Sequence, residues 1–250
     1  MVNNISKDVF MHKIDNKVKL TDMAWPEIKE AIENGFDRVV FSLGSTEQHG
    51  PHLPLKTDTL IGEEVAYRFA KKLGNTLQAP TINVGYSKHH LAFSGSLSLS
   101  QETLKAVICD YLDCLIKHGF KTIILLPYHG GNYASAQECI ELYAKKHPDL
   151  KIVGYTNLLG IEHIINDHAG HDETSLFMAL SEAEVRADKF EPGYLGKINE
   201  EAINTIFEKG MPALTNNGVL GDPTGASVQK GNEIFDIYVD FLIEKIEAQL

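Results

Sequence analysis

Short apolar runs alternate along the chain with longer stretches in which apolar residues recur at helical spacing. The short runs are bounded by glycine, proline or polar residues and predict buried strands at 38–43, 77–84, 122–126 and 152–155, with Pro80 interrupting the second strand early. The longer stretches predict a helix that ends near Gly35 and further helices over about 59–73, Ser98 or Ser100 to 117, 133–146, 172–183 and 199–208. A last amphipathic helix is predicted to open at Asp222-Pro223-Thr224-Gly225 and to reach the C-terminus.

This order of elements predicts an α/β fold with a mainly parallel sheet that helices cover on both faces. Residues 1 to about 20 show little periodicity and are expected to be an extended leading segment. Because the sequence has no linker, repeat or low-complexity tract, we expect one domain over residues 1–250. Sites in such sheets form beyond the carboxyl ends of the strands, which directs attention to the segments that follow them.

Composition narrows the class of protein. The chain has 250 residues, of which 43% are hydrophobic and 23% charged, as is usual for a soluble globular protein. Its net charge of −11 argues against nucleic acid or an anionic membrane as the main partner. Without a signal peptide, a spanning segment or paired cysteines, we expect a cytoplasmic protein with reduced thiols.

The first candidate site follows the strand at 38–43. Glu47 and His49 lie two residues apart, so a continued extended backbone would point both side chains the same way. Asp58 comes nine residues after His49 and just ahead of a predicted helix. Carboxylate, imidazole and carboxylate collected between a strand and a helix suit Zn, Mn or Fe.

Two further motifs carry histidines. His129-Gly130-Gly131-Asn132 follows the strand at 122–126, where the glycines allow a tight turn and close approach of a ligand. Residues 168–175 concentrate His168, His171, Asp172 and Glu173 at the start of a predicted helix. A lone histidine at a strand end is more often an ordinary hydrogen-bonded side chain than a ligand. Acidic residues at a helix N-terminus are also explained by their favourable interaction with the helix dipole. The dipole does not account for the histidines.

Together these segments resemble the creatininase (creatinine amidohydrolase) family. The resemblance rests on 44–58, the loop 86–100, His129–Asn132, 168–175 and a Gly-Asp-Pro-Thr-Gly segment near the end, in that order. It implies a three-layer α/β/α fold, a homo-oligomer, specifically a hexamer, and two divalent metal ions per chain. A small-molecule amide is the implied substrate.

The resemblance also implies roles for individual residues. Asp58 matches a ligand that bridges the two ions. Glu47 and His129 match the remaining ligands of one ion, and His49 and Glu173 those of the other. His168 matches the proton-transfer histidine. Weaker substrate-binding candidates are Gly130, Gly131, Asn132, His90 and His171.

The sequence departs from the family pattern in two places. His171 stands where many relatives have Glu. The creatinine-hydrolysing branch has a tryptophan shortly before the third motif, where this chain has Ile164 and Ile165; its single tryptophan is Trp25. Creatinine is therefore one candidate substrate among several, because other branches act on a formamide of a pyrimidine precursor or on a modified peptide.

The leading hypothesis is hydrolysis of a small cyclic or linear amide by a hydroxide that two metals share, with His168 moving the proton. A dinuclear phosphoesterase is an alternative, although the three motifs supply no arginine and only Lys56 as a lysine. A metal-binding protein of the same fold without catalytic activity is a third reading.

Overall fold

The centre of the fold is a parallel sheet of four strands. The computed structural model describes residues 17–250, so residues 1–16 of the expected leading segment lie outside the described part. The strands are β1 (Arg38–Leu43), β2 (Thr76–Gln78), β3 (Thr122–Pro127) and β4 (Lys151–Gly154), and their order in the sheet is β2-β1-β3-β4. The two central strands pair along their whole length, from Arg38 opposite Thr122 to Leu43 opposite Pro127. Their carboxyl ends therefore lie side by side.

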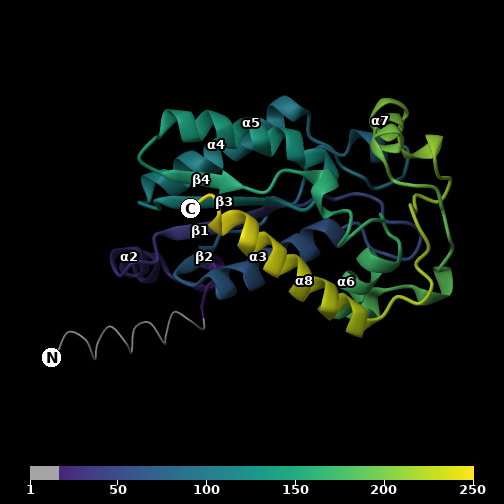
Figure 1. The fold of residues 1–250 in the computed structure, drawn as a ribbon, viewed down its shortest axis with the longest axis horizontal. Coiled ribbons are helices and arrows are strands. Elements are labelled where there is room, and N and C mark those ends of the chain that lie inside the picture. The colour runs from purple at the N-terminus through teal and green to yellow at the C-terminus, as the bar shows by residue number, and fades with distance from the viewer. Residues whose placement is uncertain (1–16) are drawn as a thin grey trace.

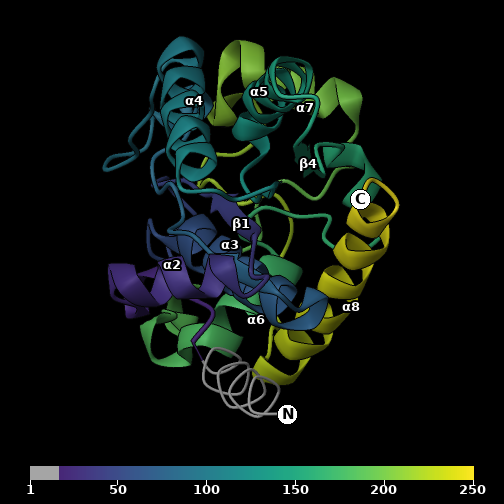
Figure 2. The same ribbon diagram turned by 90° about the vertical axis from the view of Figure 1, so that its left-hand side faces the viewer.

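Helices cover both faces of this sheet (Figure 1). They are α2 (Trp25–Glu33), α3 (Thr57–Leu73), α4 (Gln101–Lys117), α5 (Tyr133–Lys146), α6 (His171–Ser181), α7 (Glu200–Lys209) and α8 (Val228–Glu247). Figures 1 and 2 show α4 and α5 on one face, with α3, α6 and α8 on the other. This is the predicted three-layer α/β/α arrangement.

The alternation along β1 explains the two cores. Val39, Phe41 and Leu43 point to one face and pack with α4 and α5. Val40 points to the other face and joins the core that α3, α6 and α8 form. Since both faces are buried, the strand reads as a continuous apolar run rather than an alternating one.

The second strand and the last helix differ most from the sequence-based expectation. β2 ends at Gln78 rather than near residue 84, because Pro80 cannot donate a ladder hydrogen bond and Ile82 pairs with Leu43 only as an isolated bridge. The last helix begins at Val228, where the Ser227 hydroxyl accepts a hydrogen bond from the Lys230 amide. The Asp222 segment instead forms a turn, in which Asp222 accepts from the Thr224 amide.

The segment between α6 and α8 contributes a small separate core. Ile206 of α7, Met211 and Leu220 pack together. Leu220 also pairs with His168 through two backbone hydrogen bonds, which attaches this segment to the third motif. None of the described helices is long and apolar enough to cross a membrane. One domain over residues 1–250 stays a prediction.

Candidate active site

The structure brings the three motifs together at the carboxyl ends of β1 and β3. Asp58 lies in the first turn of α3, which begins at Thr57, two residues earlier than expected. Gly44 allows α3 to approach β1 closely, because a Cβ atom there would lie 2.7 Å from the Thr59 Cα. The side chains of Glu47, His49 and Asp58 are all buried. The loop after β1 thus delivers its polar side chains inward.

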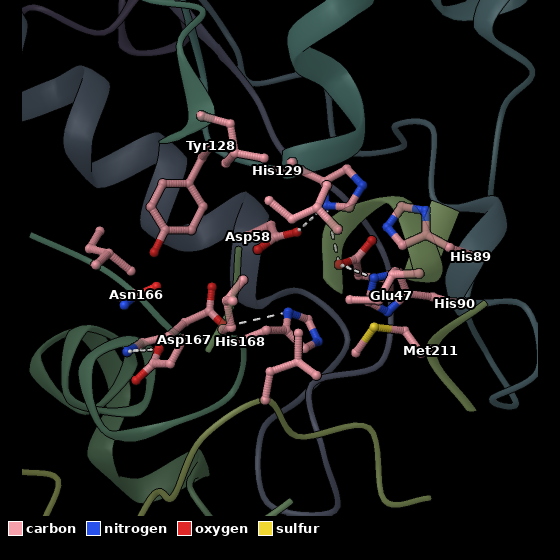
Figure 3. Close-up of a pocket in the computed structure, with 18 of the residues that line it drawn as sticks. Glu47, Asp58, His89, His90, Tyr128, His129, Asn166, Asp167, His168 and Met211 are labelled. Atoms are coloured by element: carbon pink, nitrogen blue, oxygen red, sulfur yellow. Dashed lines mark hydrogen bonds and ion pairs between the residues drawn. The ribbon is translucent and has the colours of Figure 1, made fainter. Parts of the chain in front are cut away.

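Asp58 stands between the two histidines of the first two motifs. Its Oδ1 lies 3.1 Å from His49 Nε2, and its Oδ2 lies 3.1 Å from His129 Nδ1. Each carboxylate oxygen therefore faces a different imidazole. Figure 3 shows Asp58 at the back of a cavity, with His129 beside it. This arrangement is the one that a bridging ligand requires.

Glu47 and His129 form one half of the cluster. Glu47 Oε1 lies 3.2 Å from His129 Nδ1, and Glu47 Oε2 accepts a hydrogen bond from Ser45 at 2.8 Å. The other ring nitrogen of His129 lies 3.0 Å from the Tyr86 carbonyl and 3.2 Å from the Ser87 hydroxyl. These outer contacts fix the ring orientation, as second contacts of metal-binding histidines commonly do.

His49 and Glu173 form the other half. Glu173 Oε2 lies 3.5 Å from His49 Nε2 and accepts a hydrogen bond from the Ala169 amide at 2.7 Å. Ala169 adopts a positive φ of 54°, which is rare for a residue with a side chain. Asp167 accepts hydrogen bonds from the Asp172 and Glu173 amides and so holds the first turn of α6. This half depends on a locally strained backbone.

His168 lies beside both halves. Its Nδ1 lies 3.8 Å from Glu173 Oε2, and its Nε2 lies 3.1 Å from the Gln48 carbonyl. Donor atoms of His49, His168 and Glu173 all fall within 4.8 Å of one another, as do those of Glu47, Asp58 and His129. His168 is therefore placed either to exchange a proton in the site or to act as a ligand.

The carboxylates shift the pKa of the two histidines that face them. Burial alone would lower the pKa of His129, but Glu47 and Asp58 outweigh it and raise that pKa to about 10. Burial likewise opposes the charge on His49, and Asp58 and Glu173 raise its pKa well above the usual value. The pKa of His168 is lowered by burial and by the neighbouring His49.

The cluster fits a divalent metal. It offers two imidazole nitrogens and three carboxylates, the mixed N/O set that Zn, Mn and Fe accept. Such a buried group of carboxylates is costly unless cations balance it. The raised pKa values of His49 and His129 show how strongly this pocket favours positive charge.

The weaker substrate-binding candidates divide into two groups. Gly130 and His90 line the cavity, and His90 lies 3.2 Å from Glu47. Asn132 instead has its whole amide engaged: it donates to the Leu43 and Gly44 carbonyls and accepts from the Tyr86 amide. A Cβ atom on Gly131 would lie 1.9 Å from the Tyr86 carbonyl oxygen, so this glycine serves packing.

His171 also lies away from the cavity. It is within hydrogen-bond distance of the Gly225 carbonyl, at 3.2 Å, and of Asp172, at 3.2 Å. Neither His171 nor Asn132 is part of the cavity lining. Substrate contacts by both residues stay predictions, which the hydrogen bonds of these side chains to the protein backbone do not favour.

Several site residues were missed from the sequence. The Gln48 amide lies 3.0 Å from His90 and from His168, and it also donates to the Gly218 carbonyl. Asp167 and Tyr128 line the cavity (Figure 3). Gln48 and Tyr128 each lie next to a proposed ligand in the sequence, and this position is the feature that could have marked them as site residues. Nothing local distinguishes Asp167 from a surface acid, although burial raises its pKa to about 8.

Comparison with known proteins places this site in a family. Residues 21–246 match the family model for creatininase, described as creatinine amidohydrolase. A mycofactocin precursor peptide peptidase of Mycobacterium tuberculosis is 32% identical over 220 residues, which cover 83% of this chain and 84% of the relative. The creatinine amidohydrolase of Pseudomonas putida is 24% identical, over 94% of this chain and 98% of the relative.

Solved structures agree with this placement. A creatininase crystal structure superposes with a TM-score of 0.77 at 25% identity and covers 92% of this chain and 96% of its own. A manganese creatininase gives a TM-score of 0.78 at 24% identity, covering 92% and 98%. The chain belongs to the creatininase family, whose members are hydrolases. Its α/β fold is that of creatininase.

Proposed function

We propose that this protein is a metal-dependent amidohydrolase that cleaves the C–N bond of a small cyclic or linear amide. The observation that carries the proposal is the position of Asp58, whose two oxygens each lie 3.1 Å from a different histidine. Glu47 and Glu173 complete the two halves. We propose two divalent ions per chain, either Zn, Mn or Fe, with Asp58 as the shared ligand.

The residues around these ligands have separate tasks. Bound metal would lower the pKa of water and polarise the amide carbonyl. His168 is half-buried with a lowered pKa, so it is neutral at pH 7 and can accept a proton at Nδ1, the nitrogen that faces Glu173. The protonated ring can then deliver that proton to the leaving nitrogen. Gln48 holds the opposite side of the His168 ring.

Relatives in this family act on different substrates. The names of those compared include a peptide peptidase, a creatinine amidohydrolase and, at 26% identity in Methanobrevibacter smithii, a deformylase of a ribosylaminopyrimidine 5′-monophosphate. What unites these names is hydrolysis, most often at a C–N bond. The family alone therefore supports a hydrolase, and the proposal of a non-peptide amide rests on the site.

The two alternatives are weaker. A dinuclear phosphoesterase would need cationic side chains to hold phosphate, and the cavity lining within residues 17–250 includes no lysine or arginine. A metal-binding protein without catalytic activity would have no need of His168 beside the ligands. Hexameric assembly and a cytoplasmic location stay predictions.

The test is metal analysis joined to an amide assay on the same sample. Protein purified without added metal is expected to hold about two divalent ions per chain. Hydrolysis of simple amides should disappear on chelation and return with Mn or Zn. A chain that takes up no metal would contradict the proposal. Metal uptake without hydrolysis across a broad amide panel would favour the non-catalytic alternative.

A further inference from the structure

Part of the cavity lining is apolar and comes from the α7 segment. We use α7 wall for the residues Ile198, Ile203, Ile206, Phe207, Met211 and Leu220. Ile206, Met211 and Leu220 are buried in a core of their own, so this wall is held in place by packing. Apolar surface facing a ligand cavity favours an apolar group on the ligand, because binding then removes both surfaces from water.

The rest of the cavity lining contains further apolar side chains and several acids. Leu158, Ile161 and Ile165 also line it. The acidic side chains of the lining are those of Glu47, Asp58, Glu162, Asp167 and Glu173, and among them the pKa of Asp167 is raised by burial to about 8. Metal ions would balance the carboxylates that bind them, but no cation of the described lining faces the α7 wall. An anionic group on the substrate would therefore meet an apolar surface there, with no lysine or arginine of the described lining to pair with it.

The size of the cavity limits the apolar group. Its volume is about 170 Å³. An engineered apolar cavity of roughly 150 Å³ is known to bind benzene, so the space here accommodates a compact branched or ring-sized group. A long acyl chain would exceed this volume and would have to leave the cavity, whose lining includes the 40% exposed Phe207.

We infer, on the basis of the proposed function, that the substrate is an uncharged amide with a compact apolar group that packs against the α7 wall. This distinguishes the protein from a hydrolase of a phosphorylated substrate, such as the monophosphate that one relative's name specifies. It also gives the α7 segment, which lies outside the three motifs, a role in substrate recognition.

Four linear primary amides of similar length test this inference, with ends that are isopropyl, hydroxyl, carboxylate or phosphate. The isopropyl amide, 4-methylpentanamide, should have a kcat/KM at least tenfold above the hydroxyl amide and highest overall. Binding of the same four probes to metal-loaded protein is measured by calorimetry. Selective binding of 4-methylpentanamide without hydrolysis would support the inference while contradicting the proposed function. Preference for the phosphate or carboxylate amide would overturn it.

A matched pair of variants locates the preference. Phe207→Arg puts a cation at the α7 wall, whereas Leu142→Arg changes an exposed leucine of α5 outside the cavity lining. Phe207→Arg should weaken binding of 4-methylpentanamide severalfold and strengthen binding of the carboxylate amide. Leu142→Arg should change neither. Equal effects of the two variants would show that the wall does not select the substrate.

A second, independent observation concerns Tyr128. Its hydroxyl is buried and has no hydrogen-bond partner among the described residues, yet the residue lines the cavity. Figure 3 shows the ring entering the cavity with its hydroxyl on the side of Asn166. A buried hydroxyl without a partner is unfavourable for folding, so its retention beside a site indicates a partner that binds there.

We infer that the Tyr128 hydroxyl donates a hydrogen bond to an oxygen of the bound amide. Tyr128→Phe removes this donor and keeps the ring, which packs edge-on against Tyr238 with centroids 6.4 Å apart. Tyr133→Phe is the control, because Tyr133 is buried outside the cavity lining. The probe is 4-methylpentanamide, followed by hydrolysis or, if it is not cleaved, by its Kd.

The two readouts separate binding from structure. Tyr128→Phe should lower kcat/KM or affinity about tenfold, leave metal content unchanged and keep or raise the urea midpoint of unfolding, since it deletes an unpartnered hydroxyl. The control should leave kcat/KM or affinity unchanged. Unaltered activity or affinity in Tyr128→Phe, or a loss that parallels a loss of stability or metal, would overturn the inference.

Discussion

Two sets of histidines lie at the candidate site, and their neighbours shift their pKa values in opposite directions. His49 and His129 face carboxylates at 3.1 Å, and their pKa values are raised. His89, His90 and His168 lie among other rings, with centroids 4.4 Å apart for His89 and His90 and 4.9 Å for His90 and His168. His90 and His168 each have one nearby carboxylate, Glu47 at 3.2 Å and Glu173 at 3.8 Å. Burial and the neighbouring imidazoles lower their pKa values, to about 3 for His89.

The comparison separates a region for cations from a region for neutral bases. His49 and His129 carry positive charge in the metal-free protein. Metal ions would replace their ring protons, since a ligating imidazole must be neutral. The second set stays neutral at pH 7 and can accept a proton. Residue type alone does not reveal this division, because burial and the number of close carboxylates decide it: His49 and His129 each have two carboxylates within 3.5 Å, whereas His90 has one.

Loss of Asp58 should have the largest effect, because it is shared by both halves of the first region. For Asp58→Ala we expect both metal sites to weaken and hydrolysis to vanish. Elemental analysis and the amide assay check this, with Asp113→Ala on the exposed side of α4 as the control. A variant that keeps about two metals per chain and normal turnover would refute the bridging role.

Loss of His168 tests the second region. His168→Ala should retain metal while the rate falls by roughly a hundredfold or more, the scale of general acid–base catalysis. His163→Ala is the control, since that ring packs on Phe241 and is not part of the cavity lining. Parallel loss of metal and rate would identify His168 as a ligand instead, which the 4.8 Å grouping with His49 and Glu173 permits.

Much of the first region could be predicted from the sequence. Glu47, His49 and His129 follow strong apolar runs, and parallel strands bring their carboxyl ends to one edge of the sheet. The α7 wall could not, because its position depends on contacts far apart in sequence, such as the pairing of His168 with Leu220. The same dependence turned Asn132 and His171 away from the cavity.

The pH dependence of the free energy of unfolding should reflect the pKa shifts of both sets of histidines. The raised pKa of His129 stabilises the metal-free fold fully below the unfolded value of about 6.5, and this contribution is lost as pH rises toward 10. The lowered pKa of His89 does the opposite, since stability is lost as pH falls from about 6.5 toward 3. Each proton contributes a slope of up to about 1.4 kcal/mol per pH unit.

Urea unfolding of metal-free protein should therefore give a stability maximum near pH 6.5. The raised pKa of Asp167 adds to the loss from pH 6.5 to about 8 and opposes part of the rise below pH 6.5, because its burial disfavours the ionised form from about pH 4 upward. Metal-loaded protein should lose less stability between pH 6.5 and 8, because metal replaces the protons of His49 and His129. Identical profiles with and without metal would contradict the separation of the two regions.

Ser87→Ala should give the smallest effect and shows how far the first region extends. The hydroxyl lies 2.6 Å from Ser45 and 3.2 Å from His129, so its loss loosens the support behind Glu47 and His129. The Tyr86 carbonyl still holds the same ring nitrogen at 3.0 Å. Because removal of outer partners typically costs 10–100-fold in metal affinity and one partner remains here, we expect a loss of about threefold to tenfold. Competition with a chromogenic chelator measures it, and a loss as large as that of Asp58→Ala would mean that the hydroxyl itself binds metal.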